Sequence, residues 1–310
     1  MSLIFDALQR SGVEQSGVEY PDMVSIAAAV FETTSEPEAS QKSTRVDVEE
    51  PVAIIPPNPA QDAIAETPAA EPPAQPLSFP SVEVSVTPDS RLVFLTQPES
   101  LAAEKFRFLG VRLRQLRHNR PLKKVLITST IPGEGKSLVS SNLAGVLARR
   151  KEKVLLIEGD MRRPVIGQQF GLGTLAGLSE WLQSKSQTPS NIYHLGGAGF
   201  WILPAGHPPA NTLELMQSGR LSALIRQITD WFDWIIVDSP PLLPLADTTV
   251  WTRLTDGTLL VTREGTTKKA PLERGLETIK KSDLLGIVLN SCSDSDHGDY
   301  YHRYGSGSTK

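Results

Sequence analysis

Three observations predict an α/β fold built on a doubly wound, mostly parallel sheet. Short apolar runs without polar alternation recur between residues 125 and 289, as expected of buried parallel strands. Segments with helical periodicity separate these runs, and this alternation is typical of a sheet with helices on both faces. A glycine-rich loop follows the first run and precedes a helical segment, which is the strand–loop–helix order of a phosphate-binding site.

The predicted strands and helices alternate along the chain. The apolar runs predict strands at residues 125–127, 153–158, 200–203, 234–237, 257–262 and 284–289. Helical periodicity predicts helices at residues 99–117, 139–150, 179–183, 212–232, 247–254 and 271–282. Ligands of such sheets bind outside the carboxyl ends of the strands, so the residues at those ends are the candidates for chemistry.

Composition divides the 310-residue chain into four parts. Residues 35–90 contain 11 of the 24 prolines, with ten acids against two bases and a single aromatic residue. This stretch cannot bury enough apolar surface to offset its chain entropy, so we expect a disordered linker there. It separates a leader, residues 1–34, from a folded body at residues 91–292, and a flexible tail follows at residues 293–310. The first dozen residues of the leader predict a short helix that either docks on a partner or packs on its own domain.

The charge of the chain separates an acidic N-terminal part from a mildly basic body. Residues 91–310 hold 28 bases and 20 acids, whereas the residues before them hold 3 bases and 15 acids. Five of the bases lie on the predicted helix 99–117, but no aromatic stacking set is interleaved with them. A solvated face or a subunit contact therefore fits this helix better than a nucleic-acid site.

The sequence also predicts where the protein works. Its one cysteine, Cys292, excludes an internal disulfide framework and fits a reducing compartment. No apolar run approaches the roughly 18 residues that span a bilayer, and no secretory signal opens the chain. We expect a cytoplasmic protein that reaches the inner membrane, if at all, only through a partner.

The phosphate-binding loop lies within residues 129–138, which read S-T-I-P-G-E-G-K-S-L. Two glycines allow the backbone N–H groups to turn toward an anion, and the following helix adds the positive end of its dipole. Lys136 can reach the outer phosphates, and Ser137 supplies the hydroxyl that such loops place on Mg²⁺. Thr130 stands where the usual pattern, G-x4-G-K-[ST], has its first glycine. The predicted nucleotide contacts in the loop are Pro132, Gly133, Glu134, Gly135, Lys136, Ser137 and Leu138.

Carboxylates follow two other predicted strands. Glu158 ends one strand and is followed by Gly159 and Asp160, and Asp238 directly follows another. A magnesium–nucleotide complex needs oxygen ligands or water-holding carboxylates opposite the loop hydroxyl. We therefore assign Asp238 as a candidate metal ligand. Asp160 is expected either to share the ion or to accept a proton from an attacking hydroxyl.

Three motifs carry a resemblance to a known family. They read P-G-E-G-K-S, L-L-I-E-G-D-M-R-R-P and I-I-V-D-S-P-P-L-L-P-L-A-D, and lesser matches are G-L-S-E-W-L, L-P-A-G and G-I-V-L-N. Together they resemble the bacterial tyrosine kinases (BY-kinases), the cytoplasmic autokinases of capsule and exopolysaccharide export. That family is related to the MinD/ParA ATPases, so the resemblance implies a MinD-like P-loop NTPase sheet. It covers residues 95–292 and implies ATP and Mg²⁺ as the bound species.

The resemblance implies a role for each matching residue. Lys136 would stabilise the transferred phosphoryl group, while Ser137, Asp160 and Asp238 would hold Mg²⁺. The second motif of the family, called A′, has two acids, and Glu158 and Asp160 match them here. These A′ acids would assist the tyrosine hydroxyl, which makes the catalytic set Lys136, Glu158, Asp160 and Asp238. By the same resemblance, Asn290 at the end of the last strand would contact the adenine.

The tail holds three of the five tyrosines of the chain, Tyr300, Tyr301 and Tyr304. In the family, a terminal tyrosine cluster is phosphorylated between neighbouring subunits of a ring. The resemblance therefore implies these three phosphoacceptors, a homo-oligomer, and a transmembrane activator of the polysaccharide co-polymerase type as partner. It implies regulation of exopolysaccharide or capsule biosynthesis by autophosphorylation, without nucleic acid as a partner.

The chain departs from the family pattern at three places. Glu158 is one methylene longer than the usual first A′ aspartate, and Thr130 replaces the first loop glycine. The subunit-contact motif E-x2-R-x2-R falls on Glu104, Arg107 and Gly110, so its last arginine is missing, and Arg112 is the nearest replacement.

Two alternatives remain open at this point. The chain could be a partition or positioning ATPase of the MinD/ParA type, although Ile131 stands where those loops carry an extra lysine. It could also be a non-catalytic nucleotide-binding scaffold of the polysaccharide export system, with Glu158 as a sign of lost transfer.

Overall fold

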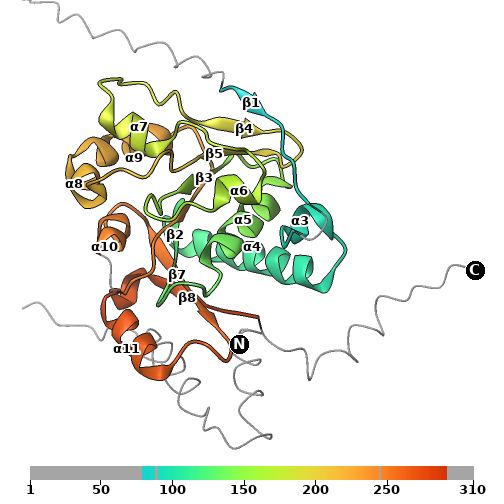
Figure 1. Ribbon diagram of the computed structural model, residues 1–310. Helices are drawn as coiled ribbons and strands as arrows, with labels where there is room; N and C mark the ends of the chain where they lie inside the picture. The colour runs from blue at the N-terminus through green and yellow to red at the C-terminus, as the bar shows by residue number, and fades with distance from the viewer. Residues whose placement is uncertain (1–78, 88–89, 244–245, 292–310) are drawn as a thin grey trace, which may run out of the picture. The chain divides into compact units, whose positions relative to one another are not determined.

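The computed structural model describes residues 79–87, 90–243 and 246–291, and it confirms the predicted α/β fold (Figure 1). In these residues a sheet of eight strands has the order β1-β4-β5-β3-β6-β2-β7-β8. Its neighbouring strands are parallel except for the antiparallel pair of β4 and β5. The leader, the tail with its three tyrosines, and Cys292 lie outside the described residues.

All six predicted strands are present, and two short ones join them. The strands are β1 Ser81–Val82, β2 Lys124–Ser129, β3 Val154–Glu158, β4 Tyr193–Leu195, β5 Phe200–Leu203, β6 Trp234–Asp238, β7 Gly257–Arg263 and β8 Leu284–Asn290. The search for apolar runs missed β1 and β4 because these strands have only 2 and 3 residues.

The predicted helices are present with two differences, and the short helices α3 and α6 were not predicted. The helices are α3 Val93–Thr96, α4 Leu101–Asn119, α5 Lys136–Ala148, α6 Ile166–Gln169, α7 Leu178–Gln183, α8 Thr212–Gln217, α9 Arg220–Thr229, α10 Asp247–Thr252, α11 Lys269–Glu277 and the 3-10 helix η1 Lys281–Asp283. The predicted helix 212–232 is wrong as a single helix, because Gly219 at φ +77° separates α8 from α9. The predicted helix 271–282 is likewise divided into α11 and η1.

The predicted C-terminal boundary of the linker, at residue 90, is too late. Residues 79–87 belong to the folded body, because Ser81 and Val82 of β1 pair with His194 and Leu195 of β4. Ahead of β1, the ring of Phe79 lies 6.0 Å from that of Trp231. Proline and acidic content described the stretch as a whole and did not reveal this short pairing segment at its end.

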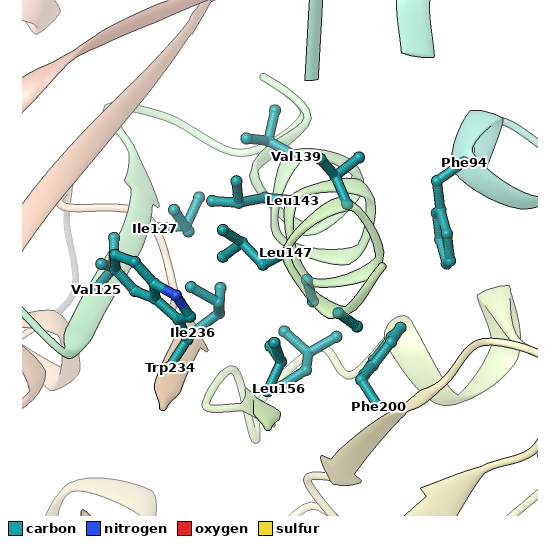
Figure 2. Close-up of a cluster of buried hydrophobic side chains, with 14 of the residues drawn as sticks. Phe94, Val125, Ile127, Val139, Leu143, Leu147, Leu156, Phe200, Trp234 and Ile236 are labelled. Atoms are coloured by element: carbon teal, nitrogen blue, oxygen red, sulfur yellow. The ribbon is translucent and has the colours of Figure 1, made fainter. Parts of the chain in front are cut away.

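Alternating strand residues separate two apolar layers, one on each face of the sheet. On β2, Val125 and Ile127 belong to the layer covered by α3, α4, α5 and α6, whereas Leu126 belongs to the layer covered by α7, α8, α9 and α10. Figure 2 shows the first layer, where Val139, Leu143 and Leu147 of α5 pack over the strands. Because α5 is buried along almost its whole length, its N-terminus is held at a fixed place above the sheet.

The bases of α4 are largely engaged with the chain itself. Arg107 pairs with Glu104, Arg114 pairs with Glu152, and the guanidinium of Arg117 lies 5.0 Å from the ring centroid of Trp234. These contacts support the interpretation of a solvated or packing face over that of a nucleic-acid site. Within the described ranges, no helix combines the length and the apolar character needed to span a membrane.

The packing of α3 on α5 generates a stability prediction. A Cβ built on Gly145 of α5 would lie 2.2 Å from Cδ2 of Phe94, whose side chain is buried. Gly145→Ala should therefore lower the free energy of unfolding by about 1–3 kcal/mol through overpacking. This loss should exceed the gain of about 1 kcal/mol in helix propensity that alanine has over glycine in a helix interior. Urea denaturation of the purified chain measures the change.

The double variant gives the control for this prediction. Phe94→Ala alone should cost about 3–5 kcal/mol because it leaves a cavity. Since it also removes the ring that the new methyl group meets, adding Gly145→Ala to it should cost nothing or stabilise the protein. Additive losses in the double variant would show that the Phe94 ring is not what excludes a side chain at Gly145.

Candidate active site

The loop between β2 and α5 has the backbone of a phosphate cradle. Gly133 and Gly135 have φ values of +86° and +96°, a left-handed conformation that other residues rarely adopt. Gly135 precedes the first turn of α5, and a Cβ there would lie 2.0 Å from Nδ2 of Asn290. Glycine at these two positions permits the turn that brings the chain to the N-terminus of α5, where the first N–H groups of a helix are available to an anion.

Lys136 lies between two carboxylates that come from the ends of neighbouring strands. Its Nζ is 3.0 Å from Oδ2 of Asp160 and 3.9 Å from Oδ2 of Asp238. Ser137 donates its hydroxyl to Oδ2 of Asp238 at 2.7 Å. The register explains this convergence, because Asp238 of β6 is paired with Glu158 of β3 and with Ile127 of β2.

Burial makes the electrostatics of this cluster strong. Asp238 is fully buried, and burial raises its pKa to about 6, although the charge of Lys136 and the Ser137 hydroxyl act in the opposite direction. Burial would lower the pKa of Lys136, but the charges of Asp238 and Asp160 outweigh it and raise that pKa above its ordinary value. Lys136 is therefore held as a cation.

Ser140 is a residue of the site that the sequence motifs did not indicate. Its hydroxyl donates to the second oxygen of Asp238 at 3.1 Å, and it lies one turn after Ser137 on α5.

The donor set of this cluster fits Mg²⁺. Ser137, Asp160 and Asp238 offer hydroxyl and carboxylate oxygens, the ligands that this hard cation prefers. Among the described residues, no group of three or more His, Cys, Asp or Glu side chains could hold a metal ion by itself. Two carboxylates beside the loop would also repel a triphosphate unless a cation accompanied it.

The two predicted A′ acids do not share one environment. Asp160 faces Lys136, whereas Glu158 is turned toward backbone N–H groups. Oε1 of Glu158 accepts hydrogen bonds from Val165 and Ile166, both at 2.6 Å, and Oε2 accepts one from Ala205 at 3.1 Å. Burial raises the pKa of Glu158 more than these hydrogen bonds lower it.

Hydrogen bonds fix the segment that carries Asp160 to the end of β6 and to the start of α10. Gly159 donates its N–H to the carbonyl of Asp238 at 2.7 Å, and Arg163 donates its N–H to Oδ1 of Asp160 at 3.1 Å. Nε and Nη2 of Arg162 donate to the two oxygens of the buried Asp247, at 2.6 and 3.2 Å. Asp247 ends the third family motif and begins a predicted helix, but no local pattern links it to the A′ motif, so its pairing with Arg162 was not predicted.

A second set of contacts fastens the phosphate-binding loop to the end of β7. The carboxylate of Glu134 is buried, and it accepts hydrogen bonds from the N–H of Ile131 at 2.9 Å and from the hydroxyl of Thr267. Thr267 in turn accepts a bond from the N–H of Arg263 at 2.8 Å. The side chain of Glu134, predicted as a nucleotide contact, therefore faces the protein, and only its backbone can face a phosphate.

Asn290 lies beside the phosphate-binding loop. Its amide donates to the carbonyl of Glu134 at 2.9 Å, and its side chain lines a cavity of about 400 Å³ beside the loop. The residues that line this cavity include Gly133, Gly135, Leu138, Gln168, Gln169 and Arg263. The volume is within the range of small-ligand sites, so a nucleoside could be accommodated next to the phosphate cradle.

Comparisons with known proteins identify the family. A family model described as ParA, NUBPL iron-transfer P-loop NTPase, matches residues 121–308. The tyrosine-protein kinase YwqD of Bacillus subtilis is 34% identical over 211 residues, which cover 67% of this chain and 89% of that kinase. The chain belongs to the bacterial tyrosine kinase family.

Two solved structures agree with this family assignment. The kinase domain of the Escherichia coli tyrosine kinase ETK matches with a TM-score of 0.61 and 30% identity, over 66% of this chain and 83% of that domain. The chimerical protein CapA2B2 matches with a TM-score of 0.62 and 28% identity, over 69% of this chain and 95% of that protein. The predicted resemblance and the predicted P-loop NTPase fold are thereby confirmed.

The structure explains the threonine at the first loop position of this BY-kinase family member. Thr130 is fully buried, and a Cβ built on Gly275 of α11 would lie 3.2 Å from its Cγ2. Its side chain thus faces α11 and leaves the phosphate cradle clear. The Thr130 hydroxyl makes no hydrogen bond within the described part of the chain.

The lesser family motifs have a structural role here. Glu180 of G-L-S-E-W-L accepts hydrogen bonds from the N–H of Gly177 at 2.7 Å and from the N–H of His207 at 2.9 Å. Gly206 of L-P-A-G leaves room for this carboxylate, because a Cβ there would lie 1.9 Å from Oε2 of Glu180. Burial acts to raise the pKa of Glu180, but the hydrogen bonds from His207 and Gly177 outweigh it and lower that pKa to about 2.

This shift predicts a pH-dependent contribution to stability. Because the pKa of Glu180 is lower in the folded protein, its contribution is complete above the ordinary glutamate value of 4.5 and is lost as the pH falls toward about 2. At neutral pH, Glu180→Gln should cost about 1–2 kcal/mol of unfolding free energy, since the site is partly exposed. Denaturation of both proteins between pH 7 and pH 3 should show this difference shrinking below pH 4.5. A constant difference would contradict the assignment.

The contact between Glu134 and Thr267 predicts an effect on nucleotide binding. Thr267→Val keeps the side-chain shape but removes the hydroxyl donor. Leaving the buried carboxylate of Glu134 without this donor should cost about 1–3 kcal/mol of free energy. We expect weaker binding of a fluorescent ATP analogue, by roughly tenfold, because the loop loses a fixed attachment. Thr267→Ser should retain affinity, and Thr266→Val, at the exposed neighbouring threonine, is the matched control. Equal affinities for Thr267→Val and the wild type would mean that this contact does not hold the loop.

Proposed function

We propose that this chain is an ATP-dependent protein tyrosine autokinase that regulates exopolysaccharide or capsule biosynthesis and export. One observation carries the proposal: Lys136 and Ser137 at the start of α5 face Asp160 and Asp238 at the ends of two adjacent strands. This arrangement offers a cation, a hydroxyl and two carboxylates around an anion cradle. Phosphoryl transfer needs little more than such positioning and charge neutralisation.

In the proposed reaction, Lys136 moves from Asp160 to the outer phosphates of ATP. Bound Mg²⁺, held by Ser137, Asp238 and Asp160, would neutralise phosphate charge. As the tyrosine oxygen bonds to the γ-phosphorus, the bond from that phosphorus to the β–γ bridging oxygen breaks, and ADP leaves. The A′ acids would assist the tyrosine hydroxyl as its phenolic proton leaves. The products are phosphotyrosine, ADP and that proton.

The same proposal includes the phosphoacceptor tyrosines and the protein partners. Tyr300, Tyr301 and Tyr304 would receive the phosphoryl group, supplied by a neighbouring subunit of a homo-oligomer. A transmembrane activator of the polysaccharide co-polymerase type would bring the protein to the inner membrane from the cytoplasm. Family membership supports these points, and the basic helix α4, whose charges are mostly engaged, gives no reason to add nucleic acid.

The subunit contact would use α4 in a modified form. Gly110, at the position of the missing arginine, is buried, and a Cβ there would lie 3.5 Å from both Nη1 of Arg114 and Cγ1 of Val146. Arg114, one turn later, extends over this glycine and pairs with Glu152. We therefore propose that any ring uses Glu104 and Arg107 without an arginine at position 110. The guanidinium of Arg112, the nearest replacement, bonds to Gln115 of the same helix.

Incubating the full chain with Mg-ATP and mapping phosphotyrosine tests the proposal. Label should appear on the tail tyrosines of the wild type and disappear in Lys136→Met, which removes the phosphate-binding charge. Asp238→Asn should reduce transfer by at least a hundredfold while the fold is kept, because Asp238 is assigned to the metal.

Asp230→Asn, at an exposed aspartate at the end of α9, is the matched control and should transfer normally. ATP hydrolysis without label would favour the MinD/ParA-type ATPase. Nucleotide binding without hydrolysis or label would favour the scaffold, and unchanged transfer in Asp238→Asn would refute the metal assignment.

A further inference from the structure

We propose that Glu158 is a positioning residue that fixes the A′ segment, residues 159–166, and does not itself assist the tyrosine hydroxyl. This inference rests on the proposed kinase function and adds a division of labour between the two A′ acids. It departs from the expectation that both acids assist the hydroxyl. The geometry points to it in three ways.

First, backbone donors and burial together close the carboxylate of Glu158 to a substrate. Oε1 is shared by the N–H groups of Val165 and Ile166, and Oε2 accepts from Ala205. The residue is 2% exposed. A tyrosine hydroxyl could reach it only by breaking these hydrogen bonds and leaving buried N–H groups unpaired, at about 1–3 kcal/mol each.

Second, the length of the side chain matches this task. Glutamate adds one methylene, about 1.5 Å of reach, to the aspartate that the family has at this position. The three N–H groups come from two separate segments, the start of α6 and the residues after β5. Glu158 therefore joins the far end of the A′ segment to the residues after β5, and an aspartate, with its shorter reach, is expected to lose part of these hydrogen bonds.

Third, the segment held in this way carries the acid that faces the site. Asp160 lies 3.0 Å from Nζ of Lys136, and Arg163, on the same segment, donates its N–H to the other oxygen of Asp160. Gly159 is fixed to Asp238, and Glu158 fixes Val165 and Ile166, so the segment is held at both ends. A misplacement of about 1 Å in such a group can cost about a hundredfold in rate.

Two substitutions distinguish a positioning role from proton transfer, because the two roles predict opposite orders of kinase activity for the two variants. Glu158→Gln keeps the length and one acceptor oxygen but cannot take a proton. Glu158→Asp keeps the carboxylate but shortens the reach. If Glu158 positions the segment, phosphorylation at saturating ATP should fall less than tenfold in Glu158→Gln and more in Glu158→Asp. KM for ATP should change less than threefold in both variants, because the phosphate-binding loop is untouched.

Proton transfer by Glu158 predicts the reverse order. Glu158→Gln would then lose about 10²–10⁴-fold, the usual contribution of a general base, and Glu158→Asp would retain most activity. That outcome would overturn the proposal. Equal activity of both variants and the wild type, after correction for the folded fraction, would overturn it as well. Glu180→Gln is the matched control, since it removes a carboxylate that also accepts two backbone N–H groups but lies outside the cluster of Lys136.

Limited trypsin digestion supplies a readout that does not depend on catalysis. Arg162 is 42% exposed in its side chain, and the bond after it lies within the A′ segment, whereas the bond after Arg163 precedes Pro164 and resists trypsin. Cleavage after Arg162 should be at least threefold faster in Glu158→Asp than in the wild type or Glu180→Gln. Equal cleavage rates would contradict the attachment even if no kinase activity were found. A wild type without phosphotyrosine but with this cleavage pattern would refute the proposed function alone.

Discussion

The buried cluster of Lys136, Asp160 and Asp238 is the constraint on which the rest of the structure depends. Removing charges from water costs several kcal/mol for each ion, and the cost is recovered only when each charge has a close partner. Here Lys136 has two acids within 4 Å, and Asp238 also accepts bonds from the hydroxyls of Ser137 and Ser140. The sheet supplies this precision, because the register of β2, β6 and β3 fixes where their carboxyl ends meet.

The same cluster suits the chemistry proposed for it. A buried cation that is already paired with acids can exchange one of them for a phosphate without a large change in desolvation. In a site of low dielectric constant, fixed charges and N–H dipoles act strongly on the charge that develops during transfer. The contacts of Glu134 with Thr267 and of Arg162 with Asp247 would keep these groups in place while the partners change.

Much of the fold and of the site could be predicted because local pattern and geometry coincide there. Apolar runs marked the six long strands, and parallel strands bring the residues after their carboxyl ends together, so Asp160 and Asp238 could be placed beside Lys136 from sequence. The short strands β1 and β4 have too few residues to form a pattern. The environment of Glu158 depends on N–H groups at positions 165, 166 and 205, and no spacing rule connects these with a strand end. The buried side of Glu134 was missed for the same reason, because Thr267 lies 133 residues away.

A crystal structure of the full chain with Mg²⁺ and a non-hydrolysable ATP analogue tests the central claim most directly. The account predicts that the outer phosphates lie within about 3 Å of Nζ of Lys136, with the metal bound to the Ser137 hydroxyl. It also predicts that the distance from Lys136 to Asp160 increases beyond the present 3.0 Å. A nucleotide bound away from α5, with the pair of Lys136 and Asp160 unchanged, would contradict the account.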